Sequence, residues 1–234
     1  GMDFFVSKKT TIGVLATGFL NQFKMNGISS TDFRDKNQTL TSRFATDAFN
    51  HNQLNNYTGN VNLKHDFGKG RELSADADYS YFDGNSGNDL NTTYYSPDNV
   101  ITSKDIFRNI MPSNISIAGA KIDYIHPLKK GKFETGAKSS LVNTDNDMRF
   151  ETLTDNQWIL DPKRSNRFIY KENINAVYAN YSTSLNKNTQ LQLGVRAEHT
   201  HSKGNSVTLN SVIDRNYVNL FPSVFVSRTL DTNN

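Results

Sequence analysis

The chain has 234 residues, enough for one large all-β domain or two smaller ones, and carries a net charge of +3. With 15 Phe and 10 Tyr, it is too aromatic for a disordered chain, and its charge is too small to indicate a nucleic-acid partner. The absence of cysteine excludes a disulfide framework and a cysteine-ligated metal site. No stretch is long and apolar enough for a transmembrane helix.

The first third of the chain predicts strands joined by polar segments. Residues 4–26 alternate apolar and polar side chains, while 24–40 are rich in Gly, Ser and Asp and predict a loop. Residues 41–54 are either a strand or an irregular return. The segments 57–67 and 73–82 alternate cleanly on either side of Gly68-Lys69-Gly70, where two glycines permit a tight turn.

The middle of the chain predicts one more strand pair between two loops. Residues 83–112 predict a long polar excursion with room for a helical turn near 103–109. Strands are expected at 114–126 and 132–148. A further loop, 149–166, contains the single tryptophan, Trp158.

A hairpin over 167–203 is the clearest element. Asn186-Lys187-Asn188 is the turn, and the second arm places apolar and polar residues on opposite faces. A loop at 202–214 and a strand at 216–229 follow, and the chain closes on a turn at 231–234. Pro222 lies inside that last strand and cannot donate a ladder hydrogen bond, so we expect the ladder to break there. The apolar set of the second arm is Leu191, Leu193, Val195 and Ala197, and the polar set is Gln190, Gln192, Arg196 and Glu198.

The spacing of the turns predicts the architecture. Short turns near Lys9, Lys69, Lys130, Lys187 and Asp231 lie about one strand pair apart. The units give about eight antiparallel strands with all short turns at one end and all long loops at the other. This asymmetry, with aromatics near the strand ends, is typical of an outer-membrane β-barrel. A soluble β-sandwich or up-and-down barrel shows the same alternation and remains an alternative.

Three motifs near the C-terminus carry a family resemblance. They are Asn175-Ala176-x-Tyr178-Ala179, then Leu193-Gly194-Val195-Arg196-Ala197-Glu198, then Tyr217 with Leu220-Phe221-Pro222-Ser223. This region resembles the barrel of Bacteroidetes-type TonB-dependent receptors and related outer-membrane β-barrel proteins. The resemblance covers about 60 residues, and residues 1–166 share only the general pattern of alternating strands and polar segments.

The resemblance implies a place and a role. Such receptors have a 22-stranded barrel with an N-terminal plug that engages TonB, and they import a large ligand such as a glycan, siderophore or peptide. We therefore expect residues 1–234 to be a single barrel segment without a plug, in contact with the lipid of the bacterial outer membrane. Gly1 before Met2 is typical of a residue left by tag removal. The free edge strands of such a segment would favour self-association.

Candidate site residues fall into two groups. Loop aromatics Tyr94, Tyr95 and Trp158 are candidate ligand contacts, because aromatic rings in surface loops stack on ligands. Arg196 and Glu198 lie on the polar face of a strand and would point into the lumen, or would simply form a cross-strand ion pair. His199 and His201 share a face without a third ligand, so no metal site is expected.

No motif indicates catalysis, and we expect no enzyme activity and no cofactor. The predicted function is the wall and extracellular loops of an outer-membrane receptor or transporter. The alternative from another class is a soluble cell-surface β-sandwich that binds carbohydrate or acts as an adhesin.

Overall fold

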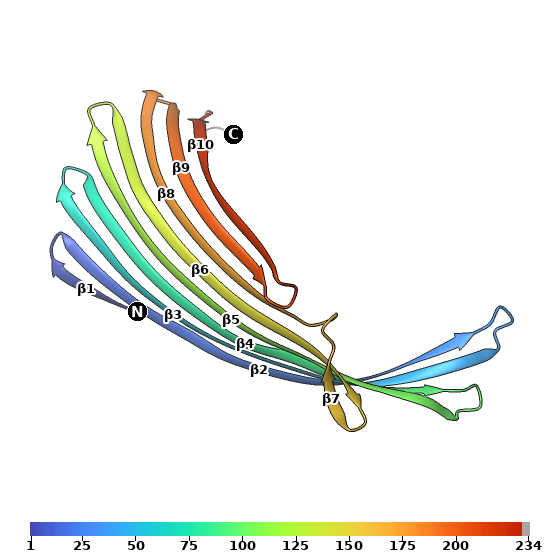
Figure 1. Ribbon diagram of the computed structural model, residues 1–234. Helices are drawn as coiled ribbons and strands as arrows, with labels where there is room; N and C mark the ends of the chain where they lie inside the picture. The colour runs from blue at the N-terminus through green and yellow to red at the C-terminus, as the bar shows by residue number, and fades with distance from the viewer. Residues whose placement is uncertain (231–234) are drawn as a thin grey trace.

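The computed structural model describes residues 1–230, and within them ten β-strands form one antiparallel sheet (Figure 1). The bounds are β1 Met2–Ser7, β2 Thr10–Arg34, β3 Leu40–Gly68, β4 Arg71–Tyr95, β5 Ile101–Leu128, β6 Gly131–Thr154, β7 Gln157–Leu160, β8 Asn166–Asn186, β9 Thr189–Ser206 and β10 Ser211–Arg228. Chain neighbours are sheet neighbours throughout, except that the short β7 pairs only with β6 and β8 takes the next place. The predicted all-β meander is confirmed, with ten strands rather than about eight.

The predicted long loops are wrong, because most of their residues continue the strands. β2 runs to Arg34 and β4 to Tyr95, so the connections after them are only 35–39 and 96–100. The helical turn expected near 103–109 is strand, and 41–54 belongs to β3. Likewise β7 occupies part of the expected 149–166 loop. The far ends are therefore long β-hairpins.

Four of the five two-residue turns lie at one end of the sheet, as predicted, while the β6–β7 turn at 155–156 lies at the other end. The connections β1–β2, β3–β4, β5–β6 and β8–β9 each leave two residues between strands. Gly68, Lys69 and Gly70 all have positive φ (81°, 55° and 75°), which explains two glycines at that turn. The turn expected at 231–234 lies outside the described residues.

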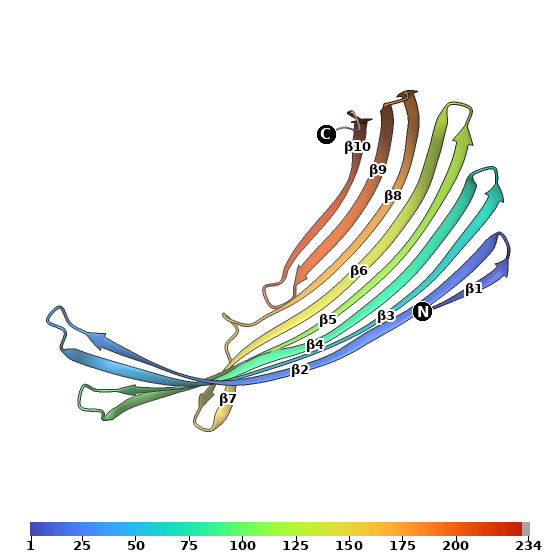
Figure 2. The same cartoon turned by 180° about the vertical axis from the view of Figure 1, so that it is seen from behind.

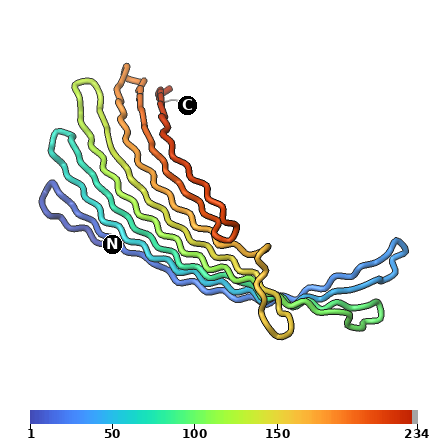
Figure 3. Tube along the Cα trace, viewed as in Figure 1, coloured from blue at the N-terminus to red at the C-terminus, as the bar shows by residue number. Residues whose placement is uncertain are grey.

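The sheet curves and twists along its length (Figures 1 and 2). The short turns line up along one margin, and the β2–β3 and β4–β5 hairpins project far beyond the other strands at the opposite end. Figure 3 shows the same path as a trace, with β8, β9 and β10 ending earlier. We call the part near the short turns the near half and the projecting part the far half.

A second layer is absent from the described residues, so they enclose no conventional core. Ala176, at 4% exposure, is the one buried hydrophobic residue among them. A β-sandwich buries the inner faces of two sheets, and the predicted alternative of a soluble sandwich therefore does not describe this chain. Within residues 1–230 no helix is long and apolar enough to span a membrane.

Pro222 does not break the ladder, contrary to expectation. β10 pairs with β9 in unbroken register from Ser211 to Arg228, with Pro222 opposite Val195. The amide of Thr229 donates to the carbonyl of Asn188 at 2.8 Å. Hydrogen-bonded and non-hydrogen-bonded pairs alternate along an antiparallel ladder, so residue 222 is in a non-hydrogen-bonded pair and its nitrogen points away from β9. Since β10 is an edge strand of the described sheet, the missing N–H costs no bond within it.

Candidate functional site

The register gives the sheet two chemically distinct faces in its near half. Residues paired across strands point to the same side, so Leu63, Ala75, Ile122, Ala137 and Val177 form one row on what we call face A. The adjacent row, one residue along each strand, belongs to face B. It contains Asn62, Asp76, Lys121, Lys138, Ala176 and Glu198.

Face A carries an exposed apolar band. Arg71 and Arg228 lie on this face beside the short turns, but the band that follows them along the strands contains no Asp, Glu, Lys or Arg among the described residues. Its members are partly or strongly exposed, with Val177 at 59%. The apolar band consists of Ile12, Val14, Ala16, Gly59, Val61, Leu63, Leu73, Ala75, Ala77, Ala118, Ala120, Ile122, Thr135, Ala137, Ser139, Leu141, Val177, Ala179, Leu191, Leu193, Val195, Ala197, Val218, Leu220, Pro222, Val224 and Val226.

Aromatic side chains border this band on both sides. Phe67, Tyr124, Phe133 and Tyr181 lie near the short turns, with the rings of Phe67 and Tyr124 6.3 Å apart. Tyr57, Tyr79 and Tyr81 lie at the upper margin, where Tyr57 and Tyr81 are register partners. From Leu73 to Tyr81 the strand rises about 27 Å, and a tilt of 35–45° leaves a band about 20 Å tall.

Only some of the aromatic residues near the strand ends belong to this border. Tyr79 and Tyr81 lie on face A, but the register places Phe19, Phe23, Phe82, Phe168 and Tyr170 on face B. Sequence periodicity defines two faces for each strand separately, and only the pairing shows which faces of neighbouring strands coincide.

The apolar band follows the line of turns rather than the rows of register partners. Ala77 and His199 share one such row, through Ala120, Ser139 and Asn175. Ala77 is eight residues from Lys69, whereas His199 is twelve from Lys187. The strands are therefore staggered, as they are in a tilted barrel wall, and polar residues of β8 and β9 lie above the band.

Face B carries a lattice of polar and charged side chains at the same level. Lys64 pairs with Glu72 at 2.8 Å, and Lys132 pairs with Glu134 at 2.7 Å. Asp123 contacts both Lys121 and the hydroxyl of Tyr178. The face therefore presents paired charges and hydrogen-bonding groups rather than an apolar surface.

Arg196 and Glu198 lie on face B, as their alternation predicted. Two guanidinium nitrogens of Arg196 donate to one Glu198 oxygen, at 3.1 and 2.8 Å. The pair runs along one strand, two residues apart, and is not the cross-strand pair that was the alternative. Both side chains are partly exposed, at 34% and 22%, so they remain available to solvent on that face.

Tyr94 lies in an aromatic ladder in the far half. The rings of Phe33 and Phe44 are 5.8 Å apart, and those of Phe44 and Tyr94 are 5.9 Å apart. All three belong to face B by register. A hydrogen bond to the Asp105 carboxylate, together with burial, raises the pKa of the Tyr94 phenol above 10.0. The ladder therefore combines apolar rings with a negative group.

Tyr95 and Trp158 are placed differently from Tyr94. Tyr95 ends β4 opposite Arg43. Trp158 is on β7, where the guanidinium of Arg108 stacks 4.2 Å from its ring centre and also donates to Glu151 at 2.6 Å. This cluster lies on face A by register. The structure thus places Tyr94 and Trp158 on opposite faces.

Sequence reasoning missed a second aromatic group on face B. Phe107 and Phe150 stack with ring centres 5.4 Å apart, and the Arg164 guanidinium lies 3.7 Å from the Phe150 ring. Neither Phe107 nor Phe150 stands in a distinctive motif. Only the pairing of β5 with β6 could have brought them together.

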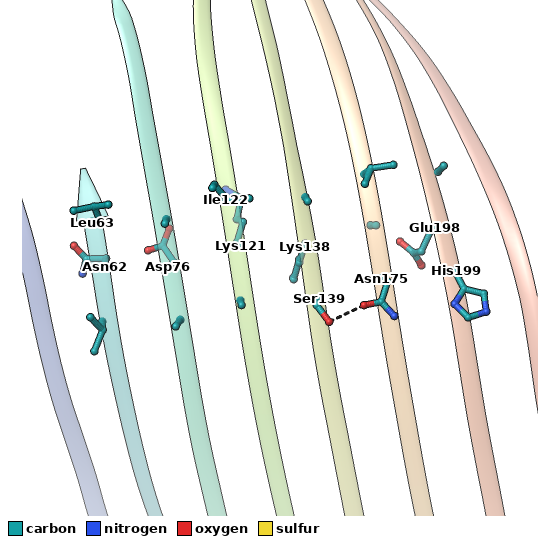
Figure 4. A pocket seen from close by; sticks show the side chains of 18 of the residues that line it. Asn62, Leu63, Asp76, Lys121, Ile122, Lys138, Ser139, Asn175, Glu198 and His199 are labelled. Carbon is teal, nitrogen blue, oxygen red and sulfur yellow. Dashed lines mark hydrogen bonds between the residues drawn. The ribbon is translucent and has the colours of Figure 1, made fainter. Parts of the chain in front are cut away.

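A shallow hollow of about 780 Å³ crosses the apolar band of face A (Figure 4). Small side chains such as Ala75, Ala120 and Ala137 form its floor, with Leu63 and Ile122 beside them. Ser139 donates to Asn175 at 2.7 Å near its margin. Within residues 1–230, no group of three or more His, Cys, Asp or Glu side chains is placed to hold a metal ion.

Comparison with known proteins identifies a family. A sequence model described as the outer membrane protein beta-barrel family matches residues 65–234, well over half of the chain. A search of curated proteins found no match.

Several solved structures align over nearly the whole chain. The siderophore receptor PiuA from Acinetobacter baumannii aligns at 13% identity and a TM-score of 0.49, over 96% of this chain and 43% of its own. The unliganded ferric citrate transporter FecA aligns at 14% identity and a TM-score of 0.43, over 97% of this chain and 40% of its own. The outer membrane protease OmpT from Escherichia coli aligns at 11% identity and a TM-score of 0.34, over 97% of this chain and 81% of its own. The chain spans less than half the length of the first two proteins.

Proposed function

We propose that this chain, which belongs to the outer membrane protein beta-barrel family and lies in the bacterial outer membrane, forms part of the wall of a receptor or transporter for a large ligand. The near half crosses the bilayer with face A toward lipid and face B toward the lumen. The far-half hairpins project from the cell, because short turns of such barrels face the periplasm.

The charge-free apolar band carries this proposal. A charge on the lipid face of a barrel is costly at the bilayer midplane, and that cost explains why the band excludes charge. Face B at the same level carries Lys64, Glu72 and the Arg196–Glu198 pair, which suits a hydrated lumen. Water on both faces would give no reason for this contrast.

The ligand-contact proposal centres on Tyr94. The Phe33–Phe44–Tyr94 ladder lies on the lumen-side face of the projecting hairpins and offers aromatic surface beside the Asp105 carboxylate. Such a surface suits a glycan, a siderophore or a peptide with aromatic or cationic groups. Tyr95 and Trp158 are proposed as contacts at the rim, where Arg108 holds the tryptophan ring.

TonB dependence and the non-enzymatic role belong to the same proposal. The described strands supply barrel wall, and coupling to TonB would require a plug domain. Face B carries paired charges and hydrogen-bonding groups over the described residues, and these suit contacts with a polar ligand.

The test uses the longest natural polypeptide that contains this sequence, purified in detergent. Binding of oligosaccharide, ferric siderophore and peptide panels is compared between wild type, Tyr94→Ala and the control Tyr124→Ala. Tyr124 is an aromatic on face A near the short turns. We expect one ligand class to bind, and Tyr94→Ala to weaken it at least tenfold while the control does not. Binding of no class, or equal loss in both variants, would contradict the proposal.

A further inference from the structure

Two lysines oppose each other above the apolar band, separated from it by Asn173 and Asn175 on β8 and by His199 and His201 on β9. Lys171 on β8 and Lys203 on β9 are register partners on face A. Side chains so placed are about 5 Å apart at Cβ, and like charges directly opposite are destabilising. Both residues are exposed. Packing of their aliphatic side-chain carbons therefore does not account for placing two lysines opposite each other. An anionic ligand between the ammonium groups would relieve the repulsion.

Two of the neighbouring carboxylates are paired with arginines, and a third is hydrogen-bonded to a histidine. Asp145 accepts two hydrogen bonds from Arg167, at 3.0 and 2.7 Å, and Asp147 pairs with Arg149 at 3.1 Å. Asp214 is the register partner of Lys203, yet its carboxylate contacts His201 at 2.9 Å. Within residues 1–230 neither lysine forms an ion pair.

The two lysines lie beyond the upper margin of the apolar band, and their stems can reach back toward the lipid headgroup layer. Lys203 follows Ala197 by six residues, and Lys171 precedes Val177 by six. Each lysine is therefore about 20 Å along its strand from Ala197 or Val177. In a tilted strand this corresponds to about 15 Å along the membrane normal. Lysine stems reach back several ångströms toward the interface. The headgroup layer adds roughly 5–8 Å beyond the hydrocarbon on each side.

We propose that Lys171 and Lys203 bind the phosphate group of an outer-leaflet lipid on the lipid-facing side of the barrel wall. Paired cations beside a lipid-exposed apolar surface are suited to a phosphate headgroup whose acyl chains lie against the band. Val177 and Val195 lie below the lysines on the same strands and provide that surface. The proposal requires only the membrane placement of the wall, not receptor activity.

The experiment uses native mass spectrometry of the protein in neutral detergent micelles. The probes are phosphatidic acid, phosphatidylcholine and inorganic phosphate. The variants are Lys171→Gln/Lys203→Gln, the charge-preserving Lys171→Arg/Lys203→Arg, and the control Lys69→Gln/Lys187→Gln at the short turns. Circular dichroism and heat-modifiable mobility on gels confirm that each variant is folded, and the arginine pair tests the charge even if the glutamine pair fails to fold.

We expect phosphatidic acid to bind wild type in preference to phosphatidylcholine. The glutamine pair should weaken that binding about twenty- to thirtyfold, since each basic residue near an anionic surface contributes about fivefold. The arginine pair should retain binding, and the turn control should not change it. Equal binding by wild type and the glutamine pair, loss in the arginine pair, loss in the turn control, or inorganic phosphate binding as tightly as the lipid would each overturn the proposal.

Discussion

The composition of face A differs between the near and far halves of the sheet. The apolar band of this face contains no charged side chain, whereas farther from the short turns face A carries the Asp32–Arg43, Arg108–Glu151 and Asp145–Arg167 pairs. The strands continue without interruption across the change, and β3 spans both halves. The same continuous strands therefore contact lipid in one part and water in another, and the change in composition of face A marks the boundary.

The largest expected effect comes from adding charge to face A in each half. Val195→Lys should destabilise the protein in lipid vesicles by about 2–4 kcal/mol, because Val195 lies inside the apolar band, away from its upper margin. Ile28→Lys, at a face A position of 83% exposure in the far half, should change stability by less than about 0.5 kcal/mol. Chemical denaturation in vesicles measures both. Equal costs would remove the distinction between the halves.

Adding a methyl group tests the difference between the two faces. A Cβ on Gly136 would lie 2.5 Å from the Asp123 Oδ1 and 2.7 Å from the Tyr178 ring on face B, whereas one on Gly59 would meet nothing within 4 Å on face A. Gly136→Ala should cost about 1–3 kcal/mol through overpacking. Gly59→Ala should be close to neutral. The same denaturation assay compares them, and a costly Gly59→Ala would show that face A is covered.

Removing one ring tests how the far half is held together without lipid. Phe44→Ala breaks both contacts of the Phe33–Phe44–Tyr94 ladder and should cost about 0.5–1 kcal/mol, the scale of cross-strand aromatic pairs. Hydrogen exchange should speed up in the far parts of β2, β3 and β4 and stay unchanged near Gly68. Faster exchange at the short turns would mean that the two halves are not independent.

The smallest effect is the titration of an ion pair in the far half. A hydrogen bond from Arg43, assisted by its charge and by Arg34, lowers the pKa of Asp32. The pair therefore stabilises the hairpin above the unfolded pKa of about 3.9, and this contribution is lost as pH falls through the lower folded pKa. NMR of the Asp32 carboxyl carbon should show a low midpoint that rises in Arg43→Gln. An identical midpoint in both proteins would refute this.

The near half could be predicted because its signals are local. Alternation at Val61, Leu63 and their neighbours, with glycines at the turn after β3, specifies strands and turns without knowledge of their partners. The same alternation placed Arg196 and Glu198 on one face. Alternation alone did not separate a membrane barrel from a sandwich, and the single layer of described residues resolves that choice.

The far half could not be predicted because its strands depend on pairing. Residues 83–95 are rich in Asn, Asp, Gly and Thr, which favour turns when considered alone. In the sheet, long neighbouring strands supply their backbone partners, and polar pairs such as Thr46–Thr92 at 2.9 Å align them. Tyr94 is likewise separated from Phe44 by 50 residues and from Phe33 by 61, so its surroundings depend on register.

Spin labels at single cysteines test the central claim most directly, because the sequence has no native cysteine. The labelled variants are Val61→Cys on face A, Asn60→Cys on face B, and Ile28→Cys on face A in the far half. Accessibility to oxygen and to a water-soluble nickel complex is measured in lipid vesicles. We predict that oxygen reaches residue 61 preferentially, while the nickel complex reaches 60 and 28. Preferential access of the nickel complex to residue 61 would show that face A meets water and would contradict the account.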